Sequence, residues 1–383
     1  MLPFQLPAPR EGAVDVLVIA GEHSGDEHAA RLVRELRAAQ PNVRVAALGG
    51  SELAAAGAQL LFDLTASSVV GLVEVLKNYS FFKTLMEATL RWIATYPPRA
   101  VLFVDYPGMN LRLAAALRER GLSVKGGGTI KTLFYISPQI WAWKAKRRFT
   151  MARDLDALAV IFPFEVACYA DTALPVEFVG HPFLAPDYAA PVTYDPAGPV
   201  LLLPGSRKQA VARIFPVLLA GYAEFLRGGA GRPATVLYPG DEILKVLRAV
   251  RPPADLQLVP TGTPIAASAV LTSSGTMSMH CALAGIPGAI AYRANVLTYL
   301  LGRMLVKIKY LGIANLLLNE PMYPEFIQGA ATPSALAAQR AAGLNDAARR
   351  AQTLERAERL RALLRRPTDG TAAAWLRRQL GGA

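Results

Sequence analysis

The sequence predicts an α/β protein built from two Rossmann-like domains, each containing a parallel sheet. Short apolar, β-branched runs alternate with longer amphipathic segments, which is typical of parallel strands connected by helices. A length of 383 residues favours two domains over one, and two domains create a cleft. With 52% hydrophobic and 18% charged residues, the chain can form buried cores, so its composition gives no case for disorder.

The predicted strands of the first half cover residues 14–20, 43–48, 100–104, 132–136, 157–161 and 176–179. Between the first two strands, Leu32, Val33 and Leu36 share one face of a crossover helix that we expect over 25–40. The alternation restarts with predicted strands over 200–203, 235–238, 257–259, 267–271 and 289–292. From residue 334 onward, a stretch rich in Ala, Leu and Arg predicts helices.

The interdomain linker is expected over 181–199, because five prolines there remove backbone donors. We therefore expect an N-terminal Rossmann-like domain over 1–190 and a C-terminal one over 191–345. Basic helices over 346–383 would follow, packing back on the N-terminal domain or on a second chain.

The charge balance predicts attraction to polyanions. Lys and Arg number 41 against 29 Asp and Glu, a net charge of +12 that suits nucleic acid, anionic lipid headgroups or phosphorylated substrates. Residues 333–383 hold ten Arg against four acidic residues, so the basic charge is uneven.

The cysteine content and the hydropathy pattern point to a cytoplasmic protein. Cys168 and Cys281 fit neither a disulfide framework nor a CxxC zinc site. The first fourteen residues lack the pattern of a signal peptide. The longest apolar stretch, 296–318, is interrupted by Arg303, Lys307 and Lys309, so any membrane contact should be peripheral.

The first candidate site is the turn 21–26, where a predicted strand ends and a helix begins. Ligands bind at such turns in open α/β sheets. Gly21 and Gly25 would let backbone amides approach a polar ligand, with Glu22 beside them. Alternatively, Ser24 or Asp26 caps the helix.

The second candidate is Asp105, which an apolar strand delivers at its C-terminal end just before Pro107 and Gly108. Its carboxylate is well placed to act as a general base. The alternative is a structural one, in which Asp105 only accepts backbone hydrogen bonds within the turn.

Trp141 and Trp143 precede four cations within residues 144–148. Interleaved aromatic and basic residues bind nucleic acid, sugars or a membrane interface. The alternative is a solvated basic helix whose tryptophans pack on the core.

In the second half, Arg207 follows a strand and could fork onto a diphosphate. Ser274, Gly275 and Thr276 open a helix expected over 277–284, which makes a ready anion site, or else supply a simple N-cap. The DxD string at 154–156 precedes a strand, so we interpret it as a chance match. The four histidines lack zinc-site spacing, and no metal or cofactor is expected.

Taken in order, the motifs resemble those of bacterial lipid A disaccharide synthases over about residues 14–330. The shared motifs are GE-x-SGD at 21–26, GG at 49–50, VGLVEVL at 70–76, DYPGMN at 105–110, SP-x-x-WAW at 137–143, FPFE at 162–165, VGHP at 179–182, LPGSR at 203–207, SGT at 274–276, YR at 292–293, NLL at 315–317 and PE-x-x-Q at 324–328.

The resemblance implies the GT-B glycosyltransferase fold, in which two Rossmann-like domains with parallel sheets face a cleft. It also implies the reaction. UDP-2,3-diacylglucosamine donates its sugar, with inversion, to the 6-hydroxyl of 2,3-diacylglucosamine 1-phosphate (lipid X). The products are the tetraacyl lipid A disaccharide 1-phosphate of lipopolysaccharide biosynthesis and UDP.

The same resemblance assigns roles to individual residues. Asp105 is the base, while Arg207 and the helix start at Ser274, Gly275 and Thr276 stabilise the diphosphate without metal. The remaining expected site residues are Asn315, Gln328 and His280 on the donor side, and Glu22, Ser24, Gly25, Asp26, Asn110, Trp141 and Trp143 on the acceptor side. The family usually has Glu at position 280, so His280 puts donor affinity or nucleotide preference in question.

Diacylated substrates imply a cytoplasmic enzyme held peripherally on the anionic inner-membrane surface. Candidate apolar contacts are residues 69–82, including Leu72, Val75, Tyr79, Phe81 and Phe82, and residues 296–310; either segment could instead be core. A homodimer is possible. Nucleic acid is not an expected partner, because no recognised nucleic-acid motif accompanies the basic residues.

Two other functions compete with this one. A UDP-N-acetylglucosamine 2-epimerase-like isomerase would share the fold and the UDP site but needs no lipid contact. A catalytically impaired, membrane-associated nucleotide-sugar binder is suggested by His280.

Overall fold

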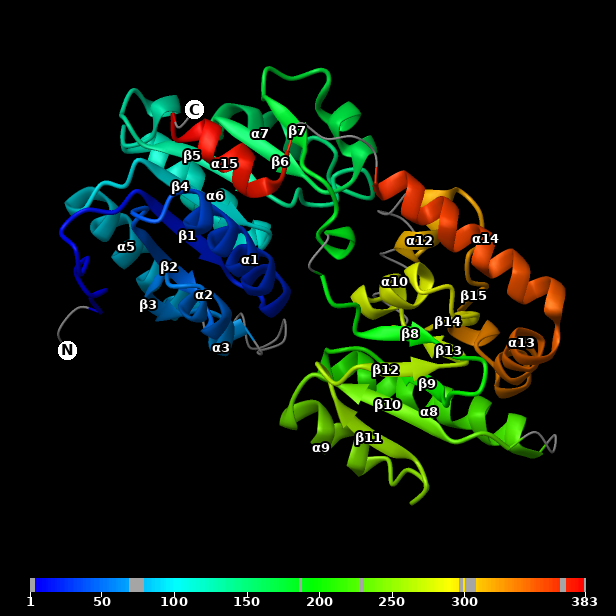
Figure 1. The fold of residues 1–383 in the computed structure, drawn as a ribbon. Helices are drawn as coiled ribbons and strands as arrows, with labels where there is room; N and C mark the ends of the chain where they lie inside the picture. Colours follow the sequence, from blue (N-terminus) through cyan, green and yellow to red (C-terminus); the bar gives the residue numbers. More distant parts are fainter. Residues whose placement is uncertain are drawn as a thin grey trace. The chain divides into compact units, whose positions relative to one another are not determined.

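The chain folds into two compact units. A computed structural model describes residues 4–68, 79–185, 188–227, 231–295, 299, 308–365 and 370–381. The first unit comprises Met1–Pro182 together with Arg366–Ala383, and the second comprises Phe183–Arg365 (Figure 1). The change of unit therefore falls before the expected boundary at 190–191, and the expected C-terminal segment 346–383 is divided between the two units.

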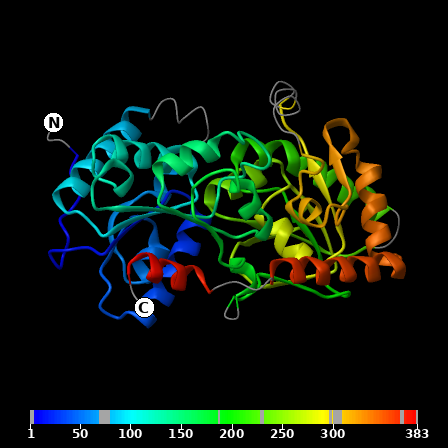
Figure 2. The ribbon, with the colours of Figure 1, turned by 90° about the horizontal axis from the view of Figure 1, so that it is seen from above.

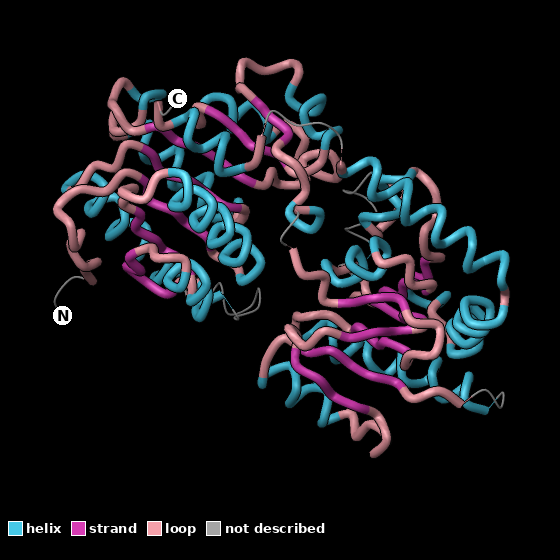
Figure 3. Tube along the Cα trace, in the orientation of Figure 1, coloured by secondary structure: helices cyan, strands magenta, loops and turns pink. Residues whose placement is uncertain are grey.

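The first unit is built on a seven-stranded parallel sheet with the strand order β3-β2-β1-β4-β5-β6-β7. Its strands are β1 (Val16–Ala20), β2 (Val45–Gly49), β3 (Gln59–Asp63), β4 (Ala100–Val104), β5 (Lys131–Tyr135), β6 (Ala157–Val160) and β7 (Val176–Phe178). Every residue of β1, β2 and β4 is buried, because helices cover both faces of the sheet. Figure 3 shows the strands of this sheet among the helices that cover them.

The helices of this unit follow the expected α/β alternation. They are α1 (His23–Ala39), α2 (Ser51–Ala55), α3 (Thr65–Ser68), α5 (Tyr79–Thr95), α6 (Pro107–Glu119) and α7 (Arg147–Asp154), with the 3₁₀ turns η1 (Val124–Gly126) and η2 (Pro163–Tyr169). The predicted crossover helix is confirmed, since α1 buries Leu32, Val33 and Leu36.

The last helix of the chain, α15 (Ala372–Gln379), belongs to the first unit and packs on α1 (Figures 1 and 2). Trp375 is buried there, and Lys131 Nζ donates to the carbonyl of Gln379 over 2.5 Å. Arg378 pairs with Glu177. The basic charge of this helix is thus partly used to attach it to the sheet of the first unit.

The second unit contains a six-stranded parallel sheet with the order β11-β10-β9-β13-β14-β15 and a two-stranded sheet of β8 and β12. The strands are β8 (Val192–Tyr194), β9 (Val200–Leu203), β10 (Ala234–Tyr238), β11 (Gln257–Pro260), β12 (Ile265–Ala267), β13 (Ala269–Thr272), β14 (Gly288–Tyr292) and β15 (Glu325–Ile327). The helices are α8 (Lys208–Arg227), α9 (Asp241–Ala249), α10 (Thr276–Leu283), α12 (Ile313–Leu318), α13 (Pro333–Asn345) and α14 (Ala347–Leu364), and η3 (Pro182–Leu184) lies at the change of unit.

The proline-rich stretch 181–199 is not only a linker. Strand β8 lies within it and pairs in parallel with β12. Ile265 N donates to the carbonyl of Pro191 over 3.0 Å, so the proline just before β8 accepts a hydrogen bond from β12.

Within the described parts of the chain, α8 alone has the length and apolar composition to cross a membrane. Its residues Val211, Phe215 and Leu218 are buried in the core of the second unit. Helix α8 is thus a core helix of this unit.

Candidate active site

The first site lies at the switch point of the seven-stranded sheet. Strands β1 and β4 are neighbours, and the chain runs from β1 to β2 and β3 on one side before β4 opens the other side. The turns that follow β1 and β4 meet there, since a Cβ atom on Gly21 would lie 2.2 Å from Cδ1 of Tyr106. In open α/β sheets ligands bind at such a point, so this is the expected place for a substrate.

Asp105 and Tyr106 adopt a backbone conformation that is unfavourable for residues other than glycine. Their φ angles are +46° and +47°, in the left-handed region, which costs roughly 1–2 kcal/mol for each residue. Such conformations persist where the surroundings impose them and are concentrated at functional sites.

Asn110 holds this turn in place. Its fully buried Nδ2 donates to the carbonyl of Asp105 over 2.8 Å and to those of Ile19 and Val104 over 3.4 Å each. The side chain thus connects the ends of β1 and β4. Asn110 therefore acts as a positioning residue for the turn.

The carboxyl group of Asp105 has a strongly shifted titration. Burial, reinforced by the negative charge of Glu22, raises its pKa to about 6, although a backbone hydrogen bond from Tyr106 opposes the rise. A carboxylate with this pKa is ionised near neutral pH and is more basic than an ordinary aspartate. The geometry and the electrostatics both suit a general base.

Some residues of the turn 21–26 are exposed and others are buried. Glu22 is exposed and Ser24 is partly exposed, whereas Gly25 and Asp26 are buried. Asp26 accepts hydrogen bonds from Gly50 N at 2.7 Å and Glu52 N at 3.0 Å. Its carboxylate therefore caps α2.

Trp141 is hydrogen-bonded to a buried acid, Glu165, which belongs to the FPFE motif at 162–165. Trp141 Nε1 donates to Glu165 Oε1 over 3.3 Å, and Phe162 N donates to Oε2 over 3.1 Å. Burial raises the pKa of Glu165 to about 8, and the negative charge of Asp105 adds to the rise, whereas these hydrogen bonds oppose it. Glu165 is thus mostly protonated at neutral pH, and only the spacing of FPFE within 162–165 could have indicated its importance.

The second site lies at the equivalent switch point of the second unit, between β9 and β13. Ser273 N donates to the carbonyl of Leu203 over 2.8 Å. Gly205 has a φ of +108°, and a Cβ there would lie 3.1 Å from Ser273 Oγ. The turns 204–207 and 273–276 therefore lie against each other, with Arg207 exposed.

Helix α10 begins at this second site without a side-chain cap. Gly275 is the N-cap residue and makes no side-chain cap hydrogen bond, so neither Ser274 nor Thr276 has the capping role. The first backbone N–H groups of a helix lack partners within the helix and carry the positive end of its dipole. Together with the exposed Arg207, this helix start can bind an anion such as a diphosphate.

His280 is buried in an aromatic cluster of the same unit. Its Nε2 lies 3.2 Å from the hydroxyl of Tyr188, and its ring centroid lies 3.9 Å from that of Phe183. A cavity of about 270 Å³ adjoins these three side chains. The residue that departs from the family pattern is therefore packed against the segment that follows the change of unit.

Asn315 and Gln328 use their side chains within the fold. Asn315 donates to Tyr323 O at 2.7 Å and Glu325 Oε1 at 2.8 Å and accepts from Tyr323 N at 2.9 Å. Gln328 exchanges two hydrogen bonds with the backbone of Ala294, at 2.9 and 3.1 Å. These amides hold the loops around β14 and β15.

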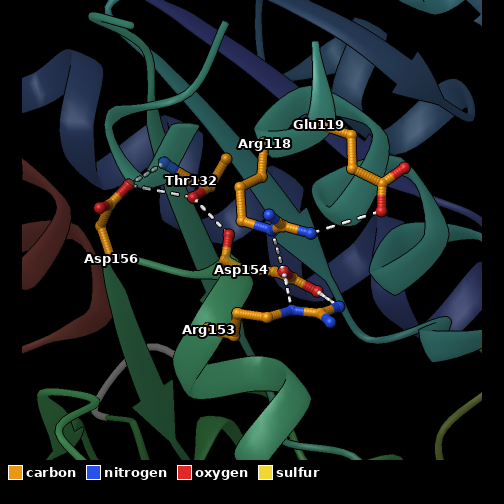
Figure 4. A network of polar contacts seen from close by, with 6 residues as sticks. All are labelled: Arg118, Glu119, Thr132, Arg153, Asp154 and Asp156. Carbon is orange, nitrogen blue, oxygen red and sulfur yellow. Dashed lines mark hydrogen bonds and ion pairs between the residues drawn. The ribbon is translucent and has the colours of Figure 1, made fainter. Parts of the chain in front are cut away.

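The DxD string is engaged in a structural network (Figure 4). Asp154 accepts hydrogen bonds from Arg118 Nε and Arg153 Nε, each over 2.7 Å. Asp156 Oδ2 accepts from the backbone N and the hydroxyl of Thr132, over 2.7 and 3.0 Å. The Asp154 carboxylate therefore connects α7 with α6, and the Asp156 carboxylate connects the segment that follows α7 with β5.

Across the described ranges, no group of three or more His, Cys, Asp or Glu side chains is arranged to hold a metal ion. The proposed lipid contacts are only partly covered by these ranges, because 69–78, 296–298 and 300–307 lie outside them. Phe81 lies against Phe4 and Phe62, with ring centroids 6.5 and 5.9 Å apart, so it packs on the core.

Solved structures with the same architecture define the class. A candidate UDP-N-acetylglucosamine 2-epimerase from Listeria monocytogenes superposes with a TM-score of 0.59 at 12% identity, covering 95% of this chain and 94% of that one. The kitacinnamycin glycosyltransferase gives a TM-score of 0.55 at 16% identity, covering 97% and 100%. The two α/β units, each with a parallel sheet, thus have the GT-B fold.

Sequence similarity then gives the family. The family model described as lipid-A-disaccharide synthetase matches residues 16–376. The lipid-A-disaccharide synthase of Nitrosococcus oceani is 35% identical over 356 residues, covering 89% of both chains. Lipid-A-disaccharide synthase 1 of Legionella pneumophila strain Paris is 37% identical over 338 residues, covering 82% of this chain and 83% of that one. The chain belongs to the lipid-A-disaccharide synthase family of glycosyltransferases.

Proposed function

We propose that this protein joins UDP-2,3-diacylglucosamine to lipid X, releasing UDP and forming the tetraacyl disaccharide 1-phosphate. The relatives named lipid-A-disaccharide synthase support this activity. The proposal is carried by the position and pKa of the Asp105 carboxyl. Asn110 holds the backbone of Asp105 in a left-handed turn at the switch point, and the pKa of the carboxyl is about 6.

In the proposed reaction, Asp105 accepts the proton of the 6-hydroxyl of lipid X. The hydroxyl oxygen bonds to the anomeric carbon of the donor from the face opposite UDP, so the configuration inverts and the bond to the diphosphate breaks. Glu22, Ser24, Trp141 and Trp143 are the proposed acceptor contacts, while Gly25, Asp26 and Asn110 support the turn.

The leaving diphosphate is stabilised in the second unit. Arg207 supplies a fixed positive charge with forked donors, and the helix start at Ser274, Gly275 and Thr276 supplies the positive end of the α10 dipole. Asn315 and Gln328 act as positioning residues through Glu325 and Ala294. His280 contacts the hydroxyl of Tyr188 and acts on the donor site through it. A change in donor affinity relative to other family members would arise at His280.

The enzyme is proposed to work in the cytoplasm, attached peripherally to the anionic inner membrane, where both diacylated substrates reside. The net charge of +12 supports this location. The possible homodimer is likewise part of the proposal, tested by the mass of the purified protein in solution.

Two experiments separate this function from its rivals. Mass spectrometry of the full chain in detergent with both lipid substrates should detect the tetraacyl disaccharide 1-phosphate and UDP. The same protein incubated with UDP-N-acetylglucosamine should give no 2-epimer, because the likeness to the epimerase is one of fold at 12% identity. UDP binding without either product would favour the impaired binder.

A further inference from the structure

Exposed hydrophobic side chains are concentrated on one part of the first unit. Of the six large ones in the described residues, four lie in two segments, and the other two, Val124 and Leu354, stand alone. The four are Trp143, Phe149, Phe164 and Val166. We name them the aromatic surface. An apolar group of this kind, exposed in a protein with well-buried cores, indicates an interaction site.

The two segments are held together by direct contacts. The rings of Trp141 and Phe164 meet edge to face, with centroids 5.6 Å apart. Arg148 forms a forked ion pair with Asp171, with N–O distances of 2.7 and 2.6 Å. Residues 141–149 and 163–171 therefore form one continuous surface.

Cations lie among these rings. Lys144 Nζ lies 4.4 Å from the Trp143 ring centroid, and the Arg148 guanidinium lies 4.4 Å from that of Phe149. In the part of the chain that the structure covers, no carboxylate lies within ion-pair distance of Lys144, Lys146 or Arg147. The surface thus combines apolar rings with three cations that no carboxylate among the described residues neutralises.

We propose that the aromatic surface docks on an anionic lipid bilayer. Aromatic rings sit at the level of the headgroups, and neighbouring Lys and Arg bind lipid phosphates, so a bilayer satisfies both halves of this surface. A protein partner would have to supply an apolar patch and three acidic groups in one place. The assignment rests on the proposed function, because diacylated sugars reside in the membrane.

The aromatic surface also adjoins the acceptor site. Trp141, which contacts Phe164, donates to Glu165, and the charge of Asp105 acts on Glu165. Docking there would bring the acceptor-side turn close to the lipid phase, which shortens the path of a diacylated acceptor to the base.

A vesicle flotation experiment with a matched control tests the proposal. The variant Lys146→Glu/Phe149→Ser removes one exposed lysine and one side chain that is 48% exposed. The control Val124→Ser/Lys125→Glu makes the same type of change at a 45% exposed side chain of the same unit. Neither pair belongs to the proposed catalytic or substrate-binding residues.

On vesicles of phosphatidylethanolamine and phosphatidylglycerol, the first variant should lose about ten-fold or more in partitioning, and the control should stay within about two-fold of the unchanged protein. The unchanged protein should float poorly with pure phosphatidylcholine. Equal binding by both variants, or equal binding to neutral vesicles, would overturn the proposal. The proposal would also be overturned if the first variant lost self-association and kept its vesicle binding, because the surface would then bind a second protein chain.

Turnover in detergent, where no vesicle is present, separates this proposal from the proposed function. Both variants should retain the rate of the unchanged protein. Loss of that rate in the first variant alone would assign these side chains to the substrate and contradict docking. If the unchanged protein forms no product while the flotation result holds, the proposed function fails and the docking surface stands.

Discussion

Replacing Asp105 with Asn should make the protein more stable and less active. The pKa of this carboxyl is about 6 in the folded protein, against 3.8 for an unperturbed aspartate. A carboxyl with a raised pKa weakens folding wherever it is ionised, so its cost is present above about pH 6 and is lost below about pH 4. This difference in pKa corresponds to a loss of about 3 kcal/mol in the free energy of unfolding at pH 8. Asn also adopts left-handed backbone more readily than most residues.

Urea unfolding of the full chain, followed by tryptophan fluorescence, measures this effect. At pH 8 the free energy of unfolding should rise by up to about 3 kcal/mol in Asp105→Asn, and the gain should shrink toward pH 4. Turnover should fall by about 10²–10⁴, as expected for loss of a general base. Asp255→Asn, which changes an exposed carboxyl, is the control and should alter neither quantity. Lower stability of Asp105→Asn at pH 8 would refute the account of burial and strain at this turn.

Three further substitutions test other parts of the site. Glu22→Gln removes a charge that raises the pKa of Asp105, so the acid limb of the pH–rate profile should move to lower pH; Glu27→Gln, one turn along α1, should leave it in place. Asn110→Ala loses the hydrogen bonds to three carbonyl groups and should destabilise the protein by about 2 kcal/mol in urea while UDP affinity is retained. Arg207→Ala should raise the UDP dissociation constant about ten-fold or more in calorimetry, whereas Lys245→Ala, on α9 of the same unit, should not change it. Unaltered UDP binding in Arg207→Ala would remove this residue from the donor site.

Much of the fold could be predicted from apolar runs. The strands expected over 100–104, 200–203 and 289–292 correspond to β4, β9 and β14. Four strands were missed because they are short or lie at an edge. Strand β3 has exposed and partly exposed residues, and β8, β12 and β15 have three residues each. The run expected over 267–271 is divided at Ser268, whose N–H donates to Pro199 O and separates β12 from β13.

The candidate site was predictable where chemistry sits at the end of a strand. Asp105 and Arg207 each follow a central strand, and the position of such a residue depends only on local sequence and topology. The roles of Asp26 and Asn315 could not be predicted in this way, because each depends on backbone groups that are distant in the chain. Glu165 was missed as a site residue for the same reason, since its pKa reflects burial that only the tertiary structure creates.

The most direct test of the account compares product formation and UDP affinity in the unchanged protein and in Asp105→Asn, with a chelator present throughout. In the proposed mechanism the first unit removes the proton and the second unit binds the diphosphate. The unchanged protein should therefore form the tetraacyl disaccharide 1-phosphate in the presence of chelator, and Asp105→Asn should lose at least about 100-fold in rate while its UDP dissociation constant stays within about two-fold. Retained turnover in Asp105→Asn, or a parallel loss of UDP binding, would contradict the assignment of the base.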